Sequence, residues 1–225
     1  MGELSSRLLC AADLIKKGAR VADIGTDHAY LPIYLIKNNI ADYCICADVR
    51  QKPLNNAAAN IASAGIKNAE TRLSNGFSAF SAGEFDTAVI AGMGGEAIAN
   101  IIDNCGYIKS PSYTLILQAM TSADYLRRYL CKGGFKIVAE KACLDSGRIY
   151  SVIKAVYTGD CFVPNAAFCA IGALDLKDSL ARQYALKQLK NTADLRNALK
   201  SVPEKQNEYR KAESLAAELE KLLGV

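Results

Sequence analysis

Residues 19–32 read ARVADIGTDHAYLP, and this stretch indicates the fold. The run Val21–Ile24 predicts a buried strand, Gly25 predicts a sharp turn, and an amphipathic helix is expected over Leu31–Asn38. In an open α/β sheet, ligands bind at the carboxyl ends of the strands, where a strand–helix turn directs its backbone N–H groups outward. The stretch therefore predicts a ligand site at the first turn of such a sheet.

The residues after Gly25 distinguish this turn from a dinucleotide-binding one. A dinucleotide fingerprint continues with two further glycines, whereas this chain continues with Thr26-Asp27-His28. Polar and ionisable side chains thus stand where bare backbone would approach a pyrophosphate. The turn favours a nucleoside-like ligand with little phosphate and disfavours an NAD-dependent oxidoreductase.

The composition restricts the class of protein. The 225 residues are 51% hydrophobic and carry a formal net charge of +4, which suits one α/β domain with a smaller appendage and permits a polyanionic partner without requiring one. The eight cysteines lack paired C-x-x-C units, and His28 is the only histidine. We therefore expect no metal site and interpret the cysteines as free thiols in a reducing cytoplasm.

We also expect no membrane partner. The first nine residues carry charges and indicate a helix start rather than a cleavable signal. The longest apolar stretch, around Thr87–Ile102, is too short to span a bilayer and contains Glu96. The sequence does not predict the oligomeric state.

Short apolar runs alternate with helical patterns over the first 160 residues. Amphipathic helices are expected at residues 31–38, 52–64, 96–104 and 123–131. Strands are expected at residues 20–25, 43–49, 70–74, 87–91, 114–118, 135–144 and 149–157. The alternation predicts a parallel sheet, and the short Asp145–Arg148 connection predicts a hairpin between the last two strands. A seven-stranded sheet closed by an antiparallel hairpin is typical of Rossmann-like class I methyltransferases.

The composition changes after about Asp160, which predicts a domain of residues 1–160 and a helical domain of residues 161–225. Helices are expected at Ala181–Lys200 and Glu204–Leu223, and together they predict an antiparallel coiled-coil hairpin. Their apolar positions recur at helical spacing: Ala181, Ala185, Leu189, Thr192, Leu195 and Leu199, then Tyr209, Ala212, Leu215, Leu219 and Leu222.

The charges of this tail allow two interpretations. Residues 175–225 contain ten Lys/Arg and eight Asp/Glu, a mixture typical of a solvated coiled coil. Alternatively, a basic stripe along one helix would contact an RNA backbone electrostatically; its members would be Lys177, Arg182, Lys187 and Lys190.

Carboxylates end the first two predicted strands. Asp23 precedes the Gly25 turn and either orients it or belongs to an ordinary strand–turn–helix junction. Asp48, followed by Val49, stands where a carboxylate accepts hydrogen bonds from ribose hydroxyls. The alternative for Asp48 is an N-cap of the next helix, and the upstream turn favours the ribose.

Turns follow the third and fourth predicted strands. Asn75-Gly76 is either a plain turn or an amide and tight turn that hold an adenine. Residues 92–95, Gly-Met-Gly-Gly, permit close backbone approach to a ligand or form only a tight helix entry. Because four ligand-type strand ends would meet at one edge of one sheet, we favour a shared ligand site.

Asp27 and His28 lie on the first turn, where we expect His28 to contact the ligand. A capping or surface histidine is the alternative. Acid, base and positioning roles are all open for this pair.

Together these residues resemble the TrmK family, bacterial tRNA methyltransferases that modify N1 of adenine 22. The resemblance covers about Leu4–Tyr157 and then a helical tail, and its most specific segments are Asp23–Pro32 and Ile90–Gly95. Further matching segments are Leu4–Leu8, Asp48, Asn75-Gly76, Leu115–Gln118 and Gly147–Tyr150. The family often has a proline after the glutamine of the fifth strand, where this chain has Ala119.

The resemblance implies a Rossmann-like methyltransferase domain with a C-terminal coiled-coil hairpin, S-adenosylmethionine as the cofactor and tRNA as the substrate. It implies Asp48 at the ribose of the cofactor and Asn75 at its adenine. The implied cofactor-binding residues are Arg7, Asp23, Gly25, His28, Asp48, Val49, Asn75, Gly76, Gly92 and Met93. The catalytic candidates are Asp27, His28 and Met93.

Two other functions fit parts of the pattern. A methyltransferase of another RNA, a protein or a small molecule would keep the cofactor and change the target, but the helical tail and residues 91–95 count against it. A non-catalytic nucleotide-binding scaffold would recruit a partner through the hairpin. Intact ligand-type residues at four strand ends count against a scaffold.

Overall fold

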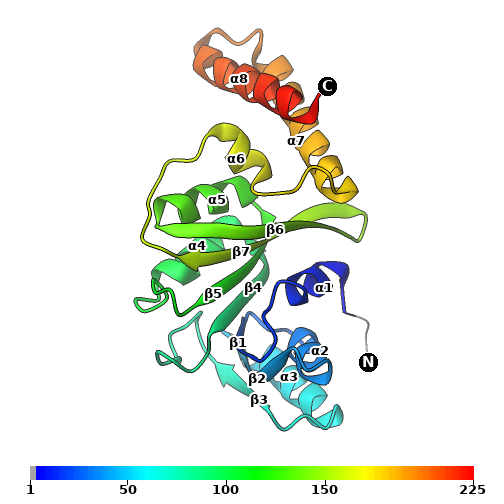
Figure 1. The fold of residues 1–225 in the computed structure, drawn as a ribbon, viewed down its shortest axis with the longest axis vertical. Helices are drawn as coiled ribbons and strands as arrows, with labels where there is room; N and C mark the ends of the chain where they lie inside the picture. Colours follow the sequence, from blue (N-terminus) through cyan, green and yellow to red (C-terminus); the bar gives the residue numbers. More distant parts are fainter. Residues whose placement is uncertain (1–3) are drawn as a thin grey trace.

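The computed structural model describes residues 4–225, and a seven-stranded mixed sheet lies at its centre (Figure 1). The strands are β1 (Ala19–Ile24), β2 (Ala41–Asp48), β3 (Ala69–Leu73), β4 (Thr87–Gly94), β5 (Thr114–Thr121), β6 (Phe135–Asp145) and β7 (Arg148–Tyr157). Their order across the sheet is β3-β2-β1-β4-β5-β7-β6. Strands β1 to β5 are parallel, whereas β7 pairs antiparallel with β5 and β6. The predicted parallel sheet closed by a hairpin is confirmed.

Helices cover both faces of this sheet. They are α1 (Ser6–Ala12), α2 (Tyr30–Lys37), α3 (Gln51–Ser63), α4 (Gly95–Asp103), α5 (Ala123–Lys132), α6 (Ala166–Ile171), α7 (Ser179–Leu199) and α8 (Gln206–Leu223), with a 3-10 turn at Pro203–Lys205. Ala88 and Leu115 pack in one core with α4 and α5, while Val89 and Ile116 pack in another with α1 and α2. Successive strand residues therefore face opposite helical layers, which explains why the strands are apolar without alternation.

The chain order reverses between β1 and β4, which are neighbours at the centre of the sheet. Strands β2 and β3 extend to one side of this point, and β5 extends to the other. In such sheets the ligand crevice forms outside the carboxyl ends of the strands where the order reverses. The fold thus places the ends of β1, β2 and β4 at one ligand-binding edge.

The β6–β7 hairpin turns at Ser146 and Gly147. Their φ angles are 49° and 74°, both in the left-handed region. Two such residues form the tight turn whose twist matches that of the flanking strands. The predicted hairpin connection is confirmed, and it sets Arg148 opposite Asp145.

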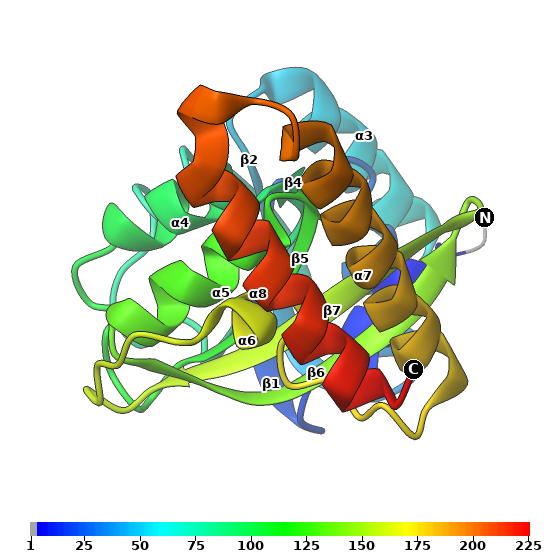
Figure 2. The ribbon, with the colours of Figure 1, turned by 90° about the horizontal axis from the view of Figure 1, so that it is seen from above.

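The C-terminal helices α7 and α8 form an antiparallel hairpin that lies over the β6–β7 part of the sheet (Figures 1 and 2). Arg182 Nη2 donates to the carbonyl of Leu223 at 2.7 Å and joins the start of α7 to the end of α8. Asp178 caps α7 by accepting the Ala181 N–H at 2.8 Å. The hairpin is confirmed, and the coiled-coil geometry stays a prediction.

The buried face of the hairpin differs from the expected one. Leu195 and Leu222 are 53% and 51% exposed, whereas Tyr184 and Leu223 are buried. The reason is that each helix of the hairpin also packs against other elements, α7 against β6 and β7 and α8 against α6. The buried faces are therefore not those of a simple two-helix contact. Helix α6 was not expected from the sequence, because its six residues are too few for a helical period to show.

All eight cysteines are free, and seven of them are buried. Within residues 4–225, no group of three or more His, Cys, Asp or Glu side chains is arranged to hold a metal ion. Among the same residues, every helix is too short or too polar to cross a membrane.

Candidate active site

The first strand–helix turn touches both neighbouring strands. The N–H groups of Gly25 and Thr26 donate to the carbonyl of Ala47 in β2, at 2.7 and 2.9 Å. Gly25 has a φ of +84°, and a Cβ at this position would lie 2.2 Å from Cε of Met93 in β4. Only glycine satisfies both the backbone angle and the close approach. The turn after β1 is thus tied to β2 by hydrogen bonds and touches the end of β4.

Asp23 presents a buried carboxylate next to this turn. The residue is 8% exposed, and burial raises its pKa from the ordinary 3.8 to about 6. A buried carboxylate is most favourable beside a positive charge or hydrogen-bond donors. Asp23 is therefore a candidate contact for a cationic group of a ligand.

Asp48 ends β2 with its side chain only 10% exposed. Its Oδ1 accepts the backbone N–H of Arg50 at 2.8 Å, an Asx-type turn. The N-cap of α3 is Arg50, so the N-cap alternative for Asp48 is wrong. Among the residues that the structure describes, none donates a hydrogen bond to Oδ2 of Asp48. One carboxylate oxygen thus shapes the turn while the other is available to a ligand hydroxyl.

The turn after β3 lies at the same edge, because β3 runs parallel to β2. Gly76 has a φ of +56°, and a Cβ there would lie 3.1 Å from Cγ2 of Ile101. Asn75 donates its N–H to Ser78 Oγ at 3.2 Å, and its side chain is exposed. This arrangement allows the Asn75 amide to reach a ligand beside Asp48.

A buried amide joins α1 to the end of β4. Gln118 of β5 is fully buried, and its Oε1 accepts the Gly92 N–H at 3.0 Å and Arg7 Nη1 at 3.3 Å. Arg7 Nε also lies 3.3 Å from Oδ2 of Asp145. A Cβ at Gly92, whose φ is +80°, would lie 3.0 Å from Arg7 Nη1. Arg7 therefore covers the Gly92 turn directly, as a half-buried lid from the N-terminal helix.

His28 is oriented by its neighbours on the first turn. Its Nε2 lies 3.2 Å from Oδ2 of Asp27, and its ring stacks on Tyr30 with centroids 5.2 Å apart. Its carbonyl accepts the side-chain N–H of Asn60 in α3 at 2.9 Å. The pair of Asp27 and His28 is preformed, and its part in binding or chemistry stays a prediction.

Comparisons with known proteins show the family of the chain. A family model described as a methyltransferase domain matches residues 4–153. The tRNA (adenine(22)-N(1))-methyltransferase of Bacillus subtilis (strain 168) is 34% identical over 154 residues, which are 68% of this chain and 65% of that protein. The chain belongs to the TrmK family of methyltransferases. The match thus spans somewhat less than two thirds of this curated relative.

Solved TrmK structures share nearly the whole fold. The crystal structure of the B. subtilis m1A22 tRNA methyltransferase TrmK has a TM-score of 0.82 at 29% identity and covers 98% of both chains. TrmK of M. capricolum, in complex with S-adenosyl-homocysteine, has a TM-score of 0.80 at 27% identity and covers 99% of both chains. Since the coverage is nearly complete, the C-terminal helices belong to the shared TrmK fold.

The structure brings most of the predicted site residues of this TrmK chain to one edge. Residues at the ends of β1, β2 and β4 contact one another or share hydrogen bonds, whereas the Val49 side chain is 59% exposed and forms no part of these contacts. Gln118 is not among the site residues expected from the sequence. A signal was present, because Gln118 is the one polar residue within the apolar run Leu115–Met120 of β5.

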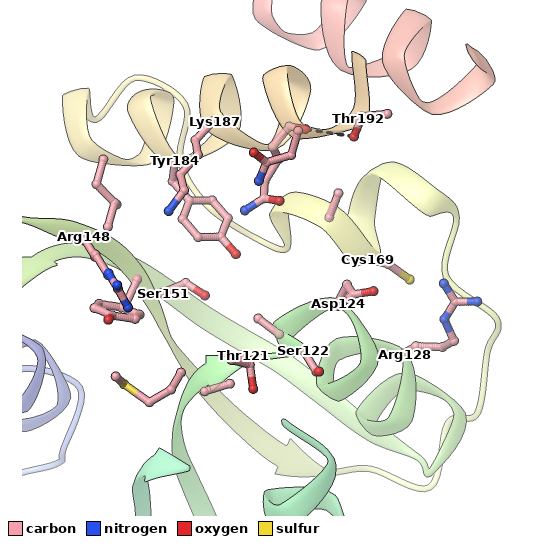
Figure 3. Close-up of a pocket in the computed structure, with 18 of the residues that line it drawn as sticks. Thr121, Ser122, Asp124, Arg128, Arg148, Ser151, Cys169, Tyr184, Lys187 and Thr192 are labelled. Atoms are coloured by element: carbon pink, nitrogen blue, oxygen red, sulfur yellow. Dashed lines mark hydrogen bonds between the residues drawn. The ribbon is translucent and has the colours of Figure 1, made fainter. Parts of the chain in front are cut away.

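A cavity of about 580 Å³ lies beside the end of β5 (Figure 3). Its walls come from the β5–α5 connection, the start of β7, α6 and α7. It adjoins the edge formed by the ends of β1, β2 and β4, because Gly94 of β4 pairs with Thr121, one of the residues that line the cavity.

Proposed function

We propose that this chain transfers a methyl group from S-adenosylmethionine to N1 of adenine 22 in the D-arm region of tRNA. The observation that carries the proposal is the edge formed by Asp23, Gly25, Asp48 and Met93 in a chain of the TrmK family. The names of the B. subtilis and M. capricolum relatives support this substrate and cofactor.

The edge fits S-adenosylmethionine, which when bound supplies an electrophilic methyl group on a sulfonium. Oδ2 of Asp48 would accept hydrogen bonds from the ribose hydroxyls, and the exposed Asn75 would contact the adenine. The buried carboxylate of Asp23 would face the methionine end with its positive charge, which would lower the pKa of Asp23 again. Gly25 and His28 would line the same end.

The target nitrogen carries a lone pair, so no side chain has to remove a proton before the attack. The main task of the protein is then to hold N1 in line with the methyl group at near-attack distance. Met93 and the Gly92 turn would line the passage between the two reactants. Asp27 and His28 would position the methionine end, and polar groups of the edge would stabilise the charge that spreads onto the base.

We assign RNA selection to the C-terminal helices, with residues 1–160 as the methyltransferase domain and residues 161–225 as the helical one. This assignment is supported by α7, which faces the end of β5 across the cavity. Where adenine 22 is paired, its N1 is buried, so the base would have to leave its helix before it is methylated. The free cysteines are consistent with a cytoplasmic location.

The test measures transfer of a labelled methyl group to two tRNA transcripts that differ only in having A or G at position 22. The proposal expects label in the first transcript and none in the second. It also expects S-adenosylhomocysteine, but not NAD, to raise the melting temperature. Equal labelling of both transcripts would overturn the assigned position, and no effect of S-adenosylhomocysteine would overturn the cofactor.

A further inference from the structure

We propose that the cavity beside β5 holds the ribose–phosphate backbone of the substrate RNA next to the target base, with Arg148 and Lys187 as its phosphate-binding side chains. The inference rests on the proposed function, because it takes RNA as the substrate. A second binding site, for RNA, would then lie beside the edge of Asp23, Gly25, Asp48 and Met93 that we assign to the cofactor.

The cavity lies next to the passage assigned to the target base, where an RNA strand that enters the passage would run. Met93 and Gly94 of β4 pair with Ala119 and Thr121 of β5, and both of these β5 residues line the cavity. The cavity therefore begins one strand away from the passage that we assign to the target base. If the target nucleotide is extruded into the passage, the nucleotides on either side of it would lie next to the cavity.

The cavity is polar and has two walls from distant parts of the chain. Figure 3 shows Thr121, Ser122 and Ser151 on the sheet side and Tyr184 and Lys187 reaching from α7 on the opposite side. Its volume of about 580 Å³ lies within the range of roughly 300–1,000 Å³ that is usual for ligand sites. Donors and acceptors on both walls suit a ribose–phosphate unit better than an apolar ligand.

The charges of the lining favour an anion. The cavity is lined by three cationic side chains, Arg128, Arg148 and Lys187, and by one carboxylate, Asp124. Arg148 and Lys187 are exposed, and neither forms an ion pair or hydrogen bond with another side chain among residues 4–225. In Figure 3, Arg128 lies at the opposite end of the cavity from Arg148. A guanidinium and an ammonium from two different elements are thus available to phosphate oxygens.

A buried hydrogen-bond network fixes the floor of the cavity. Arg127, fully buried in α5, donates to Glu140 at 2.7 Å, to Ser151 at 2.9 Å and to Tyr184 at 3.2 Å. It also donates to the carbonyls of Cys169 and Ala170 in α6, at 2.7 and 3.0 Å. Four of these partners, all except Glu140, line the cavity. The network therefore holds α6 and α7 over the sheet, so that the site is formed before RNA arrives.

The site differs from the basic stripe that the sequence suggested. Of the four residues in that stripe, only Lys187 lines the cavity. Arg182 is engaged with the end of α8, and Lys190 lies about one turn along α7 outside the lining. The cationic pair is instead completed by Arg148, which lies far from the tail in the sequence.

The test compares two double variants in binding an unmodified tRNA transcript over a range of salt concentrations. The first variant is Arg148→Ala with Lys187→Ala. The control is Lys17→Ala with Lys67→Ala, which removes the same charge from exposed lysines that precede β1 and β3 at the opposite edge of the sheet. S-adenosylhomocysteine is added to each variant to confirm that the fold and the cofactor site are intact.

The proposal expects the cavity variant to raise Kd and KM for tRNA about tenfold or more, with little change in kcat. The slope of log K against log salt should become shallower by about 1.4–1.8, the contribution of two phosphate contacts. The shift in melting temperature with S-adenosylhomocysteine should match that of the wild type. An unchanged Kd, or equal changes in both double variants, would overturn the proposal. If the wild type binds tRNA through these residues but transfers no methyl group, the cavity site stands and the proposed function fails.

Discussion

Replacing Asp23 with Asn should stabilise the protein while it weakens cofactor binding. Burial raises the pKa of Asp23 from 3.8 to about 6, so the folded protein holds this proton more tightly than the unfolded chain does. The contribution of Asp23 to stability is therefore greatest at low pH and is lost as the pH rises from about 4 to about 6. At pH 7 the ionised carboxylate costs about 3 kcal/mol of folding free energy, and most of this cost is absent at pH 4, where the folded protein keeps Asp23 protonated. Asn has nearly the same shape and removes this cost.

The assay is urea unfolding of the wild type and the Asp23→Asn variant at pH 4, 5, 6 and 7. The difference in free energy of unfolding should grow with pH toward a limit of about 3 kcal/mol, because the buried amide recovers at most the whole cost of the charge. Asp160→Asn, a change at an exposed loop residue, serves as the control and should show no such growth. Isothermal titration at pH 7.5 should show weaker binding of S-adenosylhomocysteine to Asp23→Asn. A difference in stability that does not vary with pH, or a variant that is less stable at pH 7, would refute the reasoning.

Three further substitutions probe the cofactor site at the first strand–helix turn and the buried network below the cavity. Gly25→Ala should lower the affinity for S-adenosylhomocysteine by about tenfold or more, because the new methyl group displaces Met93. The control for backbone strain in the same titration is Gly65→Ala, because Gly65 has a φ of +70° but open space around it. His28→Ala should reduce kcat or cofactor affinity without abolishing methyl transfer, and an inactive variant with unchanged cofactor binding would contradict the positioning role. Glu140→Gln should lower the free energy of unfolding by about 3–5 kcal/mol in urea, because it leaves the charge of Arg127 buried without its partner. Asp13→Asn breaks an exposed ion pair and should cost less than about 1 kcal/mol in the same experiment.

The sequence predicted the parts of this molecule that follow from local pattern. Parallel strands must place their carboxyl ends at one edge, so Asp23, Gly25 and Asp48 could be grouped before any contact was known. The two-residue turn at Ser146 and Gly147 was also predictable from local sequence, because few residue pairs adopt such a turn.

The parts that could not be predicted depend on contacts between distant segments. Arg127 is an unremarkable cation in an amphipathic helix until Glu140, Tyr184 and the carbonyls of α6 surround it. These same hydrogen bonds cross the boundary proposed at residue 160, so a truncation there would also strip buried partners from Arg127. The role of Gln118 likewise depends on Arg7, 111 positions earlier in the chain.

Primer extension on the tRNA product gives a direct readout of methylation at N1 of adenine 22. A methyl group on N1 blocks the Watson–Crick edge, so reverse transcriptase should stop one nucleotide before position 22. We expect a stop there after incubation with S-adenosylmethionine, and no new stop without the cofactor or with the cavity variant at low tRNA concentration. A cofactor-dependent stop at another nucleotide, or full-length extension through position 22 after complete incubation, would contradict it.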